Sequence, residues 1–343
     1  MAPKVTLKEI AREVGLSPTS VSLVLNDKPC KISEANRRRI KEVARKKHYI
    51  PNQIARSLVT QHSHTLGLIV PNIESRFFSS LAKNLEIRCR ERGYALFITN
   101  SDDSPSNDSE LVRLLVNRGV DGLFLVVSDE LATDAQLIED LSQLPVPYVM
   151  VDRIIDGVAC DRVRFDNEEG GYLACRHLLE HGHRRIACIA NTRSHTGSER
   201  VAGYERALDE AGIGFDDSLV LHSDYYIPDA YEAATRLAAL DVTGVLATSD
   251  NIALGTLKRL YEEGRRVPRD YSVVSYDNSA ADSLFEPALT SIEQNVGELS
   301  EAAIGLMLQR LDERAHDVEA TEVQERLLEP RLVVKDSVRD LDR

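Results

Sequence analysis

The chain has no long hydrophobic run, and this limits the class of protein it can be. No apolar stretch approaches the roughly 18 residues that a membrane-spanning helix needs. The first eleven residues alternate Lys4, Lys8 and Glu9 with single apolar residues, so they lack the continuous hydrophobic segment of a signal peptide. We therefore expect a protein that stays in the cytoplasm.

Paired cysteines are also missing. The five cysteines, Cys30, Cys89, Cys160, Cys175 and Cys188, lie far apart, and no Cys-x-x-Cys pair occurs. An odd number of scattered cysteines fits neither a disulfide framework nor a zinc site. We interpret them as buried or incidental thiols.

Sequence motifs of catalysis are absent as well. The stretch EEGG at residues 168–171 is no phosphate-binding loop, because the pattern G-x-x-x-x-G-K-[ST] does not occur. The serine, histidine and aspartate residues show no nucleophile elbow. His181 and His183 have no further ligands at a suitable spacing, so we expect no metal site. The sequence predicts neither an enzyme nor a cofactor.

What the chain does have is an uneven distribution of charge. A length of 343 residues, with 43% hydrophobic and 28% charged residues, suits a soluble protein of two or three domains. Residues 1–65 hold thirteen Lys and Arg against five Asp and Glu, a net charge of +8, while the whole chain carries −13, which leaves −21 on the remainder. A basic head on an acidic body indicates a polyanionic partner for the head only.

The start of the chain predicts two short helices joined by a tight turn. Thr6 and Glu9 have the spacing of a capping box, and Gly15 ends the apolar pattern that follows them. Ser17 and Pro18 combine a helix cap with a proline at the first helical position, so a second helix begins at once. Its apolar residues face inward, and Thr19, Leu23 and Asn26 point the other way. Such an arrangement is typical of a helix-turn-helix, whose second helix enters the major groove of DNA.

A third helix follows Ser33, with Ile40, Val43 and Ala44 predicted to face inward. Its outer face is basic and has few acidic neighbours in the sequence. A run of charges is usually just a solvated helix face, but this one lies beside a DNA-reading helix. We therefore expect phosphate contacts from some of its cations, which are Arg37, Arg38, Lys41, Arg45 and Lys46.

From Thr65 onward the pattern changes to apolar strands that alternate with helical stretches such as residues 79–92. Seven strands are predicted at TLGLIVPN, YALFITNSD, VDGLFLVV, VPYVMVD, RIACIAN, GVLATSD and YSVVSYDN. Nearly continuous apolar strands indicate parallel sheets that helices cover on both faces. Ligands of such folds bind in the loops that follow the carboxyl ends of the strands.

Aromatic and charged residues near several strand ends suit a polyhydroxylated ligand. Phe77, Phe78 and Tyr225 can form flat apolar walls, while Arg200 supplies a donor and Asp152 and Asp277 supply acceptors. Carboxylate and guanidinium groups around aromatic walls fit a sugar or a nucleoside. The polar residues at the strand ends are Asn72, Asp102, Asp152, Asp166, Asn191, Asp224, Asp250 and Asp277, and many of them are expected simply to cap helices or form turns.

The run VTLKEIAREVGLSPTSVSLVLN, continued by HYIPNQIARSL, resembles the N-terminal signature of the lactose-repressor family of bacterial transcription regulators. Segments of the body, among them SERVAGYERAL and ATSDNIALGTLKRLYEEGRRVPRDYSVVSYDN, are similar to the effector-binding core of that family. The resemblance spans nearly the whole chain. It implies an all-α helix-turn-helix DNA-binding head and an α/β core of two lobes, similar to periplasmic sugar-binding proteins.

The resemblance also implies domain limits. The DNA-binding head would cover residues 1–50, a hinge helix and linker 51–64, and the effector-binding core 65–343. Within the core, the N-lobe would comprise about 65–165 and 293–325, and the C-lobe about 166–292 and 326–340. Three crossings of the chain would join the two lobes.

In the family, the hinge helix folds on operator DNA and inserts a leucine into a minor-groove base step, and Leu58 matches this leucine. Such an apolar wedge unstacks the step and kinks the DNA. Leu23 departs from the family pattern, which usually has Arg or His there, and Ser20 stands where Thr is usual. A leucine suits a thymine methyl rather than guanine. The residues expected to contact DNA are Thr6, Ser17, Pro18, Thr19, Ser20, Ser22, Leu23, Asn26, Asn52, Ala55, Arg56 and Leu58.

For the effector, the resemblance implies a set of pocket residues taken position by position. These are Phe77, Phe78, Asp152, Ser194, Thr196, Arg200, Tyr225, Ser249, Asp250 and Asp277. Ser194 and Thr196 belong to a stretch that varies with the effector, so they carry the least information. The sequence leaves open a sugar or sugar derivative, a nucleoside or purine, and control by a phosphoprotein co-regulator.

The predicted function is therefore that of a repressor that binds operator DNA under the control of a small effector. A free sugar-binding or transport protein is a weaker alternative, because the head would then have no purpose. The chain ends in VVKDSVRDLDR without a leucine-heptad repeat. We expect a homodimer with no membrane partner.

Overall fold

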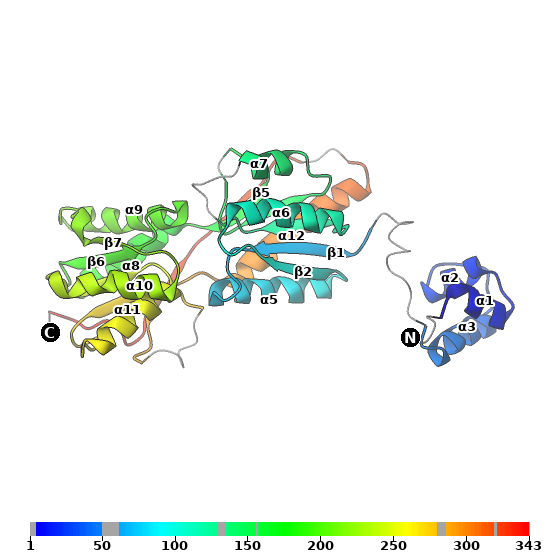
Figure 1. Ribbon diagram of the computed structural model, residues 1–343, viewed down its shortest axis with the longest axis horizontal. Coiled ribbons are helices and arrows are strands. Elements are labelled where there is room, and N and C mark those ends of the chain that lie inside the picture. Colours follow the sequence, from blue (N-terminus) through cyan, green and yellow to red (C-terminus); the bar gives the residue numbers. More distant parts are fainter. Residues whose placement is uncertain are drawn as a thin grey trace. The chain divides into compact units, whose positions relative to one another are not determined.

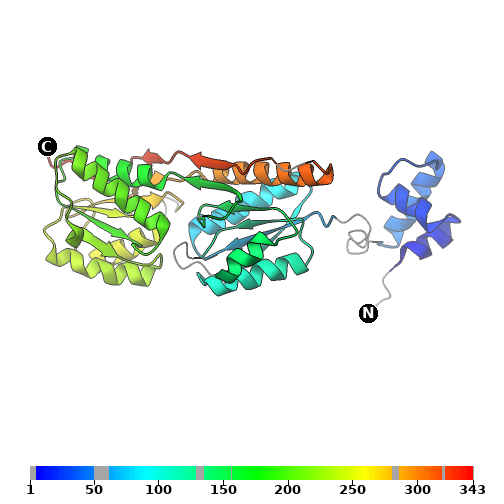
Figure 2. The same cartoon turned by 90° about the horizontal axis from the view of Figure 1, so that it is seen from above.

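A computed structural model describes residues 5–49, 62–128, 135–155, 157–279, 286–318 and 321–342. The chain forms two compact units, Met1–Ser63 and His64–Arg343. Figures 1 and 2 show the elements of both units from two directions. Among the described residues, none of the helices combines the length and the apolar character needed to cross a bilayer.

The described residues of the first unit form three helices, α1 (Leu7–Val14), α2 (Pro18–Leu25) and α3 (Glu34–Lys46). The predicted capping box is present: the Thr6 amide donates to the Glu9 carboxylate at 3.0 Å, and the Glu9 amide donates to Thr6 Oγ1 at 3.3 Å. Gly15 ends α1 with a φ of 71°, a left-handed conformation that glycine adopts without strain. Ile10, Val21 and Ile40 come from one helix each and are buried in a shared core. The predicted helix-turn-helix is confirmed.

The first lobe of the second unit is a six-stranded parallel sheet with the order β2–β1–β3–β4–β5–β11. Its strands are β1 (Thr65–Val70), β2 (Ala95–Asn100), β3 (Gly122–Leu125), β4 (Tyr148–Val151), β5 (Asp161–Phe165) and β11 (Glu325–Leu328). Helices α5 (Arg76–Glu91) and α12 (Val296–Ala315) cover one face, and α6 (Pro105–Asn117) and α7 (Ala135–Ser142) cover the other (Figure 2).

The second lobe repeats this design with the sheet order β7–β6–β8–β9–β10–β12, in which only the β10–β12 pair is antiparallel. Its strands are β6 (Ile186–Ala190), β7 (Val220–His222), β8 (Gly244–Ala247), β9 (Ser272–Asp277), β10 (Thr290–Glu293) and β12 (Arg331–Val333). Its helices are α8 (Asn167–Glu180), α9 (His195–Glu210), α10 (Ile227–Ala234) and α11 (Asp250–Glu262), with 3-10 turns at Asp217–Leu219 and Thr235–Ala239. Figure 1 shows α9 on one face and α10 on the other.

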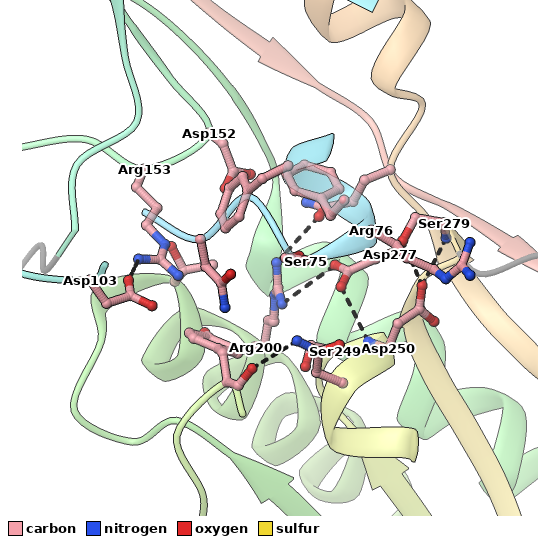
Figure 3. A pocket seen from close by; sticks show the side chains of 17 residues that line it. Ser75, Arg76, Asp103, Asp152, Arg153, Arg200, Ser249, Asp250, Asp277 and Ser279 are labelled. Carbon is pink, nitrogen blue, oxygen red and sulfur yellow. Dashed lines mark hydrogen bonds and ion pairs between the residues drawn. The ribbon is translucent and has the colours of Figure 1, made fainter. Parts of the chain in front are cut away.

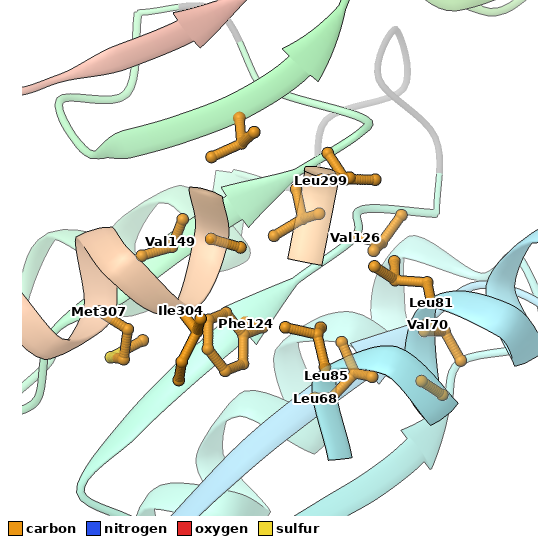
Figure 4. Packing of buried hydrophobic residues seen from close by; sticks show 14 of the residues in the cluster. Leu68, Val70, Leu81, Leu85, Phe124, Val126, Val149, Leu299, Ile304 and Met307 are labelled. Atoms are coloured by element: carbon orange, nitrogen blue, oxygen red, sulfur yellow. The ribbon is translucent and has the colours of Figure 1, made fainter. Parts of the chain in front are cut away.

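Each lobe has apolar cores between its sheet and its helices. In the first lobe, Leu68 and Phe124 from the sheet pack with Leu85 of α5 and Ile304 of α12, and all four are fully buried (Figure 4). Strands buried on both faces must be apolar at nearly every position, which explains the continuous runs seen in the sequence.

The chain crosses between the lobes three times, after β5, after β10 and after β11. The last crossing falls later than expected. Residues from 326 onward were assigned to the C-lobe, but β11 pairs with β5 from Glu325 to Leu328 and therefore belongs to the first sheet. Because of these crossings, the carboxyl ends of strands from both lobes border the same space.

Candidate functional site

One pocket lies between the two lobes, at residues that follow the carboxyl ends of strands (Figure 3). We call it the inner pocket; its volume is about 40 Å³. Nine of the ten residues expected to bind an effector line it: Phe77, Phe78, Asp152, Thr196, Arg200, Tyr225, Ser249, Asp250 and Asp277. Ser194 does not. It lines a neighbouring space, which we call the outer hollow.

Arg200 is the main buried donor of the inner pocket. Helix α9 places it beneath the pocket, where its Nε donates to Asn167 Oδ1 at 2.9 Å and its Nη1 lies 3.9 Å from the Asp277 carboxylate. Its guanidinium also stacks 3.8 Å from the centre of the Tyr276 ring. Burial alone would lower the pKa of Arg200, but Tyr276, Tyr225 and Asp277 together hold this pKa above its ordinary value. The guanidinium is therefore a permanent, positioned charge.

Asp277 faces Arg200 within a group of three carboxylates. Its Oδ2 accepts a hydrogen bond from the Asp250 amide at 3.2 Å, and Asp250 in turn accepts from Ser275 and Ser279. Burial raises the pKa of Asp277 from its ordinary value of 3.8 to about 7, Arg200 opposes the rise, and the charges of Asp250 and Asp152 add to it. Asp277 can therefore act as a hydrogen-bond donor or acceptor near neutral pH.

The raised pKa of Asp277 predicts a pH dependence of stability. The Asp277 carboxyl keeps its proton up to about pH 7 in the folded protein but only up to about pH 4 in the unfolded chain. The folded state is therefore destabilised relative to the unfolded chain as the pH rises from about 4 to about 7. Asp277→Asn removes this cost. We expect the free energy of unfolding of the variant, relative to the natural chain, to increase by roughly 1–4 kcal/mol from pH 4 to pH 7. Urea unfolding at both pH values measures the difference, and an equal difference at both would contradict the assigned pKa.

Arg153 is a buried pocket residue that the sequence did not reveal. It is only 6% exposed, and its Nη1 donates to Asp103 Oδ1 at 2.9 Å and to the carbonyl oxygen of Ser128. Its guanidinium lies 5.4 Å from the Phe78 ring centre and 5.3 Å from the Tyr225 ring centre. Since these rings come from different lobes, Arg153 links the aromatic walls of the pocket.

Gln294 was also missed. It lies at the second crossing, is 2% exposed, and accepts from Arg200 Nη2 at 3.4 Å through Oε1, while its buried Nε2 has no hydrogen-bond partner among the described residues. This donor group lines the pocket and is available to a ligand. The other pocket residues absent from the predicted set are Asn72, Ser75, Arg76, Asp103, Asn251 and Ser279. Several of them follow predicted strands, and this position is the signal that could have identified them.

Ser194 serves local structure as well as the outer hollow. Its Oγ accepts from the Gly197 amide at 2.9 Å, so it caps α9, and it lies 3.0 Å from the Tyr225 hydroxyl. Ser249 similarly caps α11 by accepting from the Ile252 amide at 3.1 Å. Thr196 is buried in the first turn of α9 and lines the inner pocket.

In the head, α2 presents the side chains predicted to read DNA. Thr19 is exposed, Leu23 is half-buried, and neither belongs to the head core. The Asn26 side chain donates to the Ser22 carbonyl oxygen at 2.7 Å and so ends α2. Ser17 caps α2 by accepting from the Ser20 amide at 3.1 Å, ahead of Pro18 in the first turn. The hinge residues Asn52, Ala55, Arg56 and Leu58 lie outside the described residues.

The basic face of α3 has more acidic partners than the sequence suggested. Lys41 pairs with Asp27 at 2.5 Å and Lys46 with Glu42 at 3.1 Å, while Arg37 lies 3.7 Å from Glu34. The expectation of few acidic neighbours is wrong for these three cations, because the fold and the helical spacing supply partners. Arg38 and Arg45 are exposed and form no ion pair within the described part of the chain.

Comparison with known proteins supports the same architecture. Residues 6–52 match the bacterial regulatory proteins of the lacI family, and residues 175–338 match the periplasmic binding protein-like domain. Over 338 residues the chain is 32% identical to the HTH-type transcriptional repressor PurR of Aliivibrio fischeri, an alignment that covers 97% of this chain and 98% of that repressor.

Two solved structures are similar over most of their length. The complex of the transcriptional regulator CelR with cellobiose shares 30% identity at a TM-score of 0.72, covering 97% of this chain and 100% of that one. A LacI-family transcriptional regulator from Enterococcus faecium with bound ribose also shares 30% identity, at a TM-score of 0.71, covering 81% of this chain and 99% of that one.

A helix-turn-helix head and a two-lobe core with a polar pocket between its lobes define a DNA-binding regulator with a small-molecule effector. The chain belongs to the lacI family of bacterial regulatory proteins. It is a transcriptional regulator and not an enzyme. The family predicted from the sequence is confirmed.

Proposed function

We propose that the protein is a repressor whose affinity for its operator changes when a sugar binds in the inner pocket. The observation that carries this proposal is the pairing of aromatic walls with buried charged groups. Phe77 and Phe78 come from the first lobe and Tyr225 from the second, and Arg200 and Asp277 lie between them. A flat sugar ring suits the walls, and its hydroxyl groups suit a guanidinium and a carboxylate.

Relatives of similar sequence support a sugar. The CelR structure holds cellobiose and the Enterococcus faecium regulator holds ribose. Four carboxylates, those of Asp103, Asp152, Asp250 and Asp277, line the pocket against three guanidinium groups, and this excess of negative charge disfavours a phosphorylated effector. An uncharged sugar avoids this repulsion. A sugar that contacts both lobes stabilises one arrangement of the lobes over another. Such a difference in sugar affinity between two arrangements is required if the sugar is to change the affinity for DNA.

For DNA binding we propose that two copies of the chain act together as a homodimer in the cytoplasm. Each head would place α2 in the major groove, where the outward Thr19 and Leu23 meet base edges, Leu23 against a thymine methyl. The exposed and unpaired Arg38 and Arg45 would contact phosphates. Leu58 would insert into a base step of the minor groove, as its match to the family hinge implies.

A thermal-shift screen of the full-length protein tests the effector class. The panel comprises pentoses, hexoses, disaccharides, nucleosides and purine bases. We expect one or more sugars to raise the Tm of the natural chain and to have no effect on Asp277→Ala, because a ligand stabilises only the folded state that binds it. A rise caused only by a nucleoside or purine would overturn the sugar assignment. A rise unchanged in Asp277→Ala would place the site elsewhere.

A further inference from the structure

The outer hollow is a space between the lobes that the proposed function leaves unused. Its volume is about 370 Å³, against about 40 Å³ for the inner pocket. Asp103, Arg153 and Tyr225 line both spaces, so the two adjoin. A ligand confined to the inner pocket would leave most of this space to water.

The outer hollow is built like the inner pocket, from residues that follow strands of both lobes. Asp102 and Asp103 follow β2, Asn191 and Arg193 follow β6, and Asp224 follows β7. The carboxyl ends of parallel strands are where such folds bind ligands. Its position is therefore that of a binding site and not of an incidental surface depression.

An aromatic ring forms part of its wall. Tyr226 is 37% exposed, and its hydroxyl donates to Asp103 Oδ2 at 3.0 Å, which fixes the ring across the gap between the lobes. The next ring, Tyr225, is shared with the inner pocket. Rings of this kind offer flat apolar surfaces to the faces of sugars.

The polar groups of the outer hollow favour hydroxyl groups over anions. Asp102, Asp103 and Asp224 supply carboxylate acceptors, and burial, together with the charge of Asp103, raises the pKa of Tyr226 to about 12. The exposed Arg193 guanidinium forms no ion pair with any described residue, so it remains available as a donor. The three carboxylates outnumber the two guanidinium groups that line the hollow, those of Arg153 and Arg193, and this excess of negative charge disfavours a phosphate or carboxylate ligand and suits a neutral polyol.

We propose that the outer hollow is a second sugar subsite, so that the effector is an uncharged disaccharide with one ring in the inner pocket and the other against Tyr226. This inference rests on the proposed function, since it assumes a sugar in the inner pocket. Arg153 lies at the junction, where its guanidinium can contact the bond that joins the rings. Arg193 and Asp224 contact the second ring alone.

Isothermal titration of the full-length protein tests the second subsite. The probes are maltose, cellobiose, lactose and xylobiose, each compared with glucose, galactose or xylose as its constituent. We expect at least one disaccharide to bind about tenfold more tightly than its monosaccharide, because it adds one or two hydrogen bonds. Arg193→Ala and Asp224→Asn should remove this gain and leave monosaccharide binding within about twofold. Arg265→Ala, at an exposed position that lines neither space, is the matched control.

The outcomes separate the two proposals. If a monosaccharide binds and Arg200→Ala abolishes its binding, but no disaccharide binds more tightly, the second subsite is wrong and the proposed function stands. The same conclusion follows if Arg193→Ala and Asp224→Asn leave a preferred disaccharide unaffected. If none of these sugars binds and a nucleoside does, the sugar assignment fails, and the second subsite fails with it.

Discussion

Replacing Arg200 by alanine should abolish effector binding and also destabilise the core. The guanidinium lies 3.9 Å from Asp277 and is the only cation that contacts this carboxylate among the described residues. Without it, Asp277, the Asn167 side chain and the Thr248 carbonyl oxygen lose their shared donor in a buried site. Removing one partner of a buried ion pair costs about 3–5 kcal/mol. We expect a loss of this size in urea unfolding, and no Tm rise with any sugar that stabilises the natural chain.

Arg206→Ala is the matched control for this experiment. Arg206 lies on the same helix, α9, but its side chain is 37% exposed and pairs with Glu168 and Glu169. An ion pair with this access to water contributes little, so we expect less than about 1 kcal/mol and an unchanged response to the effector. An Arg200→Ala protein that still binds the sugar with its natural affinity would show that the inner pocket is not the effector site.

Replacing Leu58 by alanine should weaken operator binding about a hundredfold and leave nonspecific DNA binding unchanged. The prediction rests on the match of Leu58 to the hinge leucine of the family. A methyl group cannot fill the gap between unstacked bases, so the kinked complex loses its support. Nonspecific binding depends on phosphate contacts, which the substitution does not touch. Gel-shift titrations with operator and with unrelated DNA measure both affinities, and an equal loss on the two would rule out the wedge.

Much of the fold was predictable because its buried strands are apolar at almost every position. All seven predicted strands are present, and the predicted helix at residues 79–92 corresponds to α5 (Arg76–Glu91). Strands β5, β7, β10, β11 and β12 were missed. The sequences of β5 and β11, DRVRF and ERLL, carry charges that pair across the sheet, such as Arg164 with Glu325 at 3.0 Å. Such strands are stabilised by pairing with the neighbouring strand, so no local sequence pattern predicts them.

The site was predictable only where a strand end or a family motif marked it. Arg200 and Asp277 were found in this way, and the structure brings them together. Arg153 was not, because a loop arginine is normally solvated, and its burial depends on Asp103, the Ser128 carbonyl oxygen and the two aromatic rings, which come together only in the folded protein. Gln294 was missed for a similar reason: its burial depends on a crossing between lobes, which is a property of the tertiary fold.

Linkage between sugar and operator is the most direct test of the proposed function. Anisotropy titrations of full-length protein would use a DNA sequence that the protein itself selects from a random pool and the sugar that raises its Tm. We predict that saturating sugar changes the Kd for this DNA by roughly 5–150-fold, and that saturating DNA changes the Kd for the sugar by the same factor. In Arg200→Ala, which should not bind the sugar, the same sugar concentration should leave the Kd for the DNA unchanged. A natural protein that binds its operator equally well with and without the bound sugar would contradict control of DNA binding through the pocket.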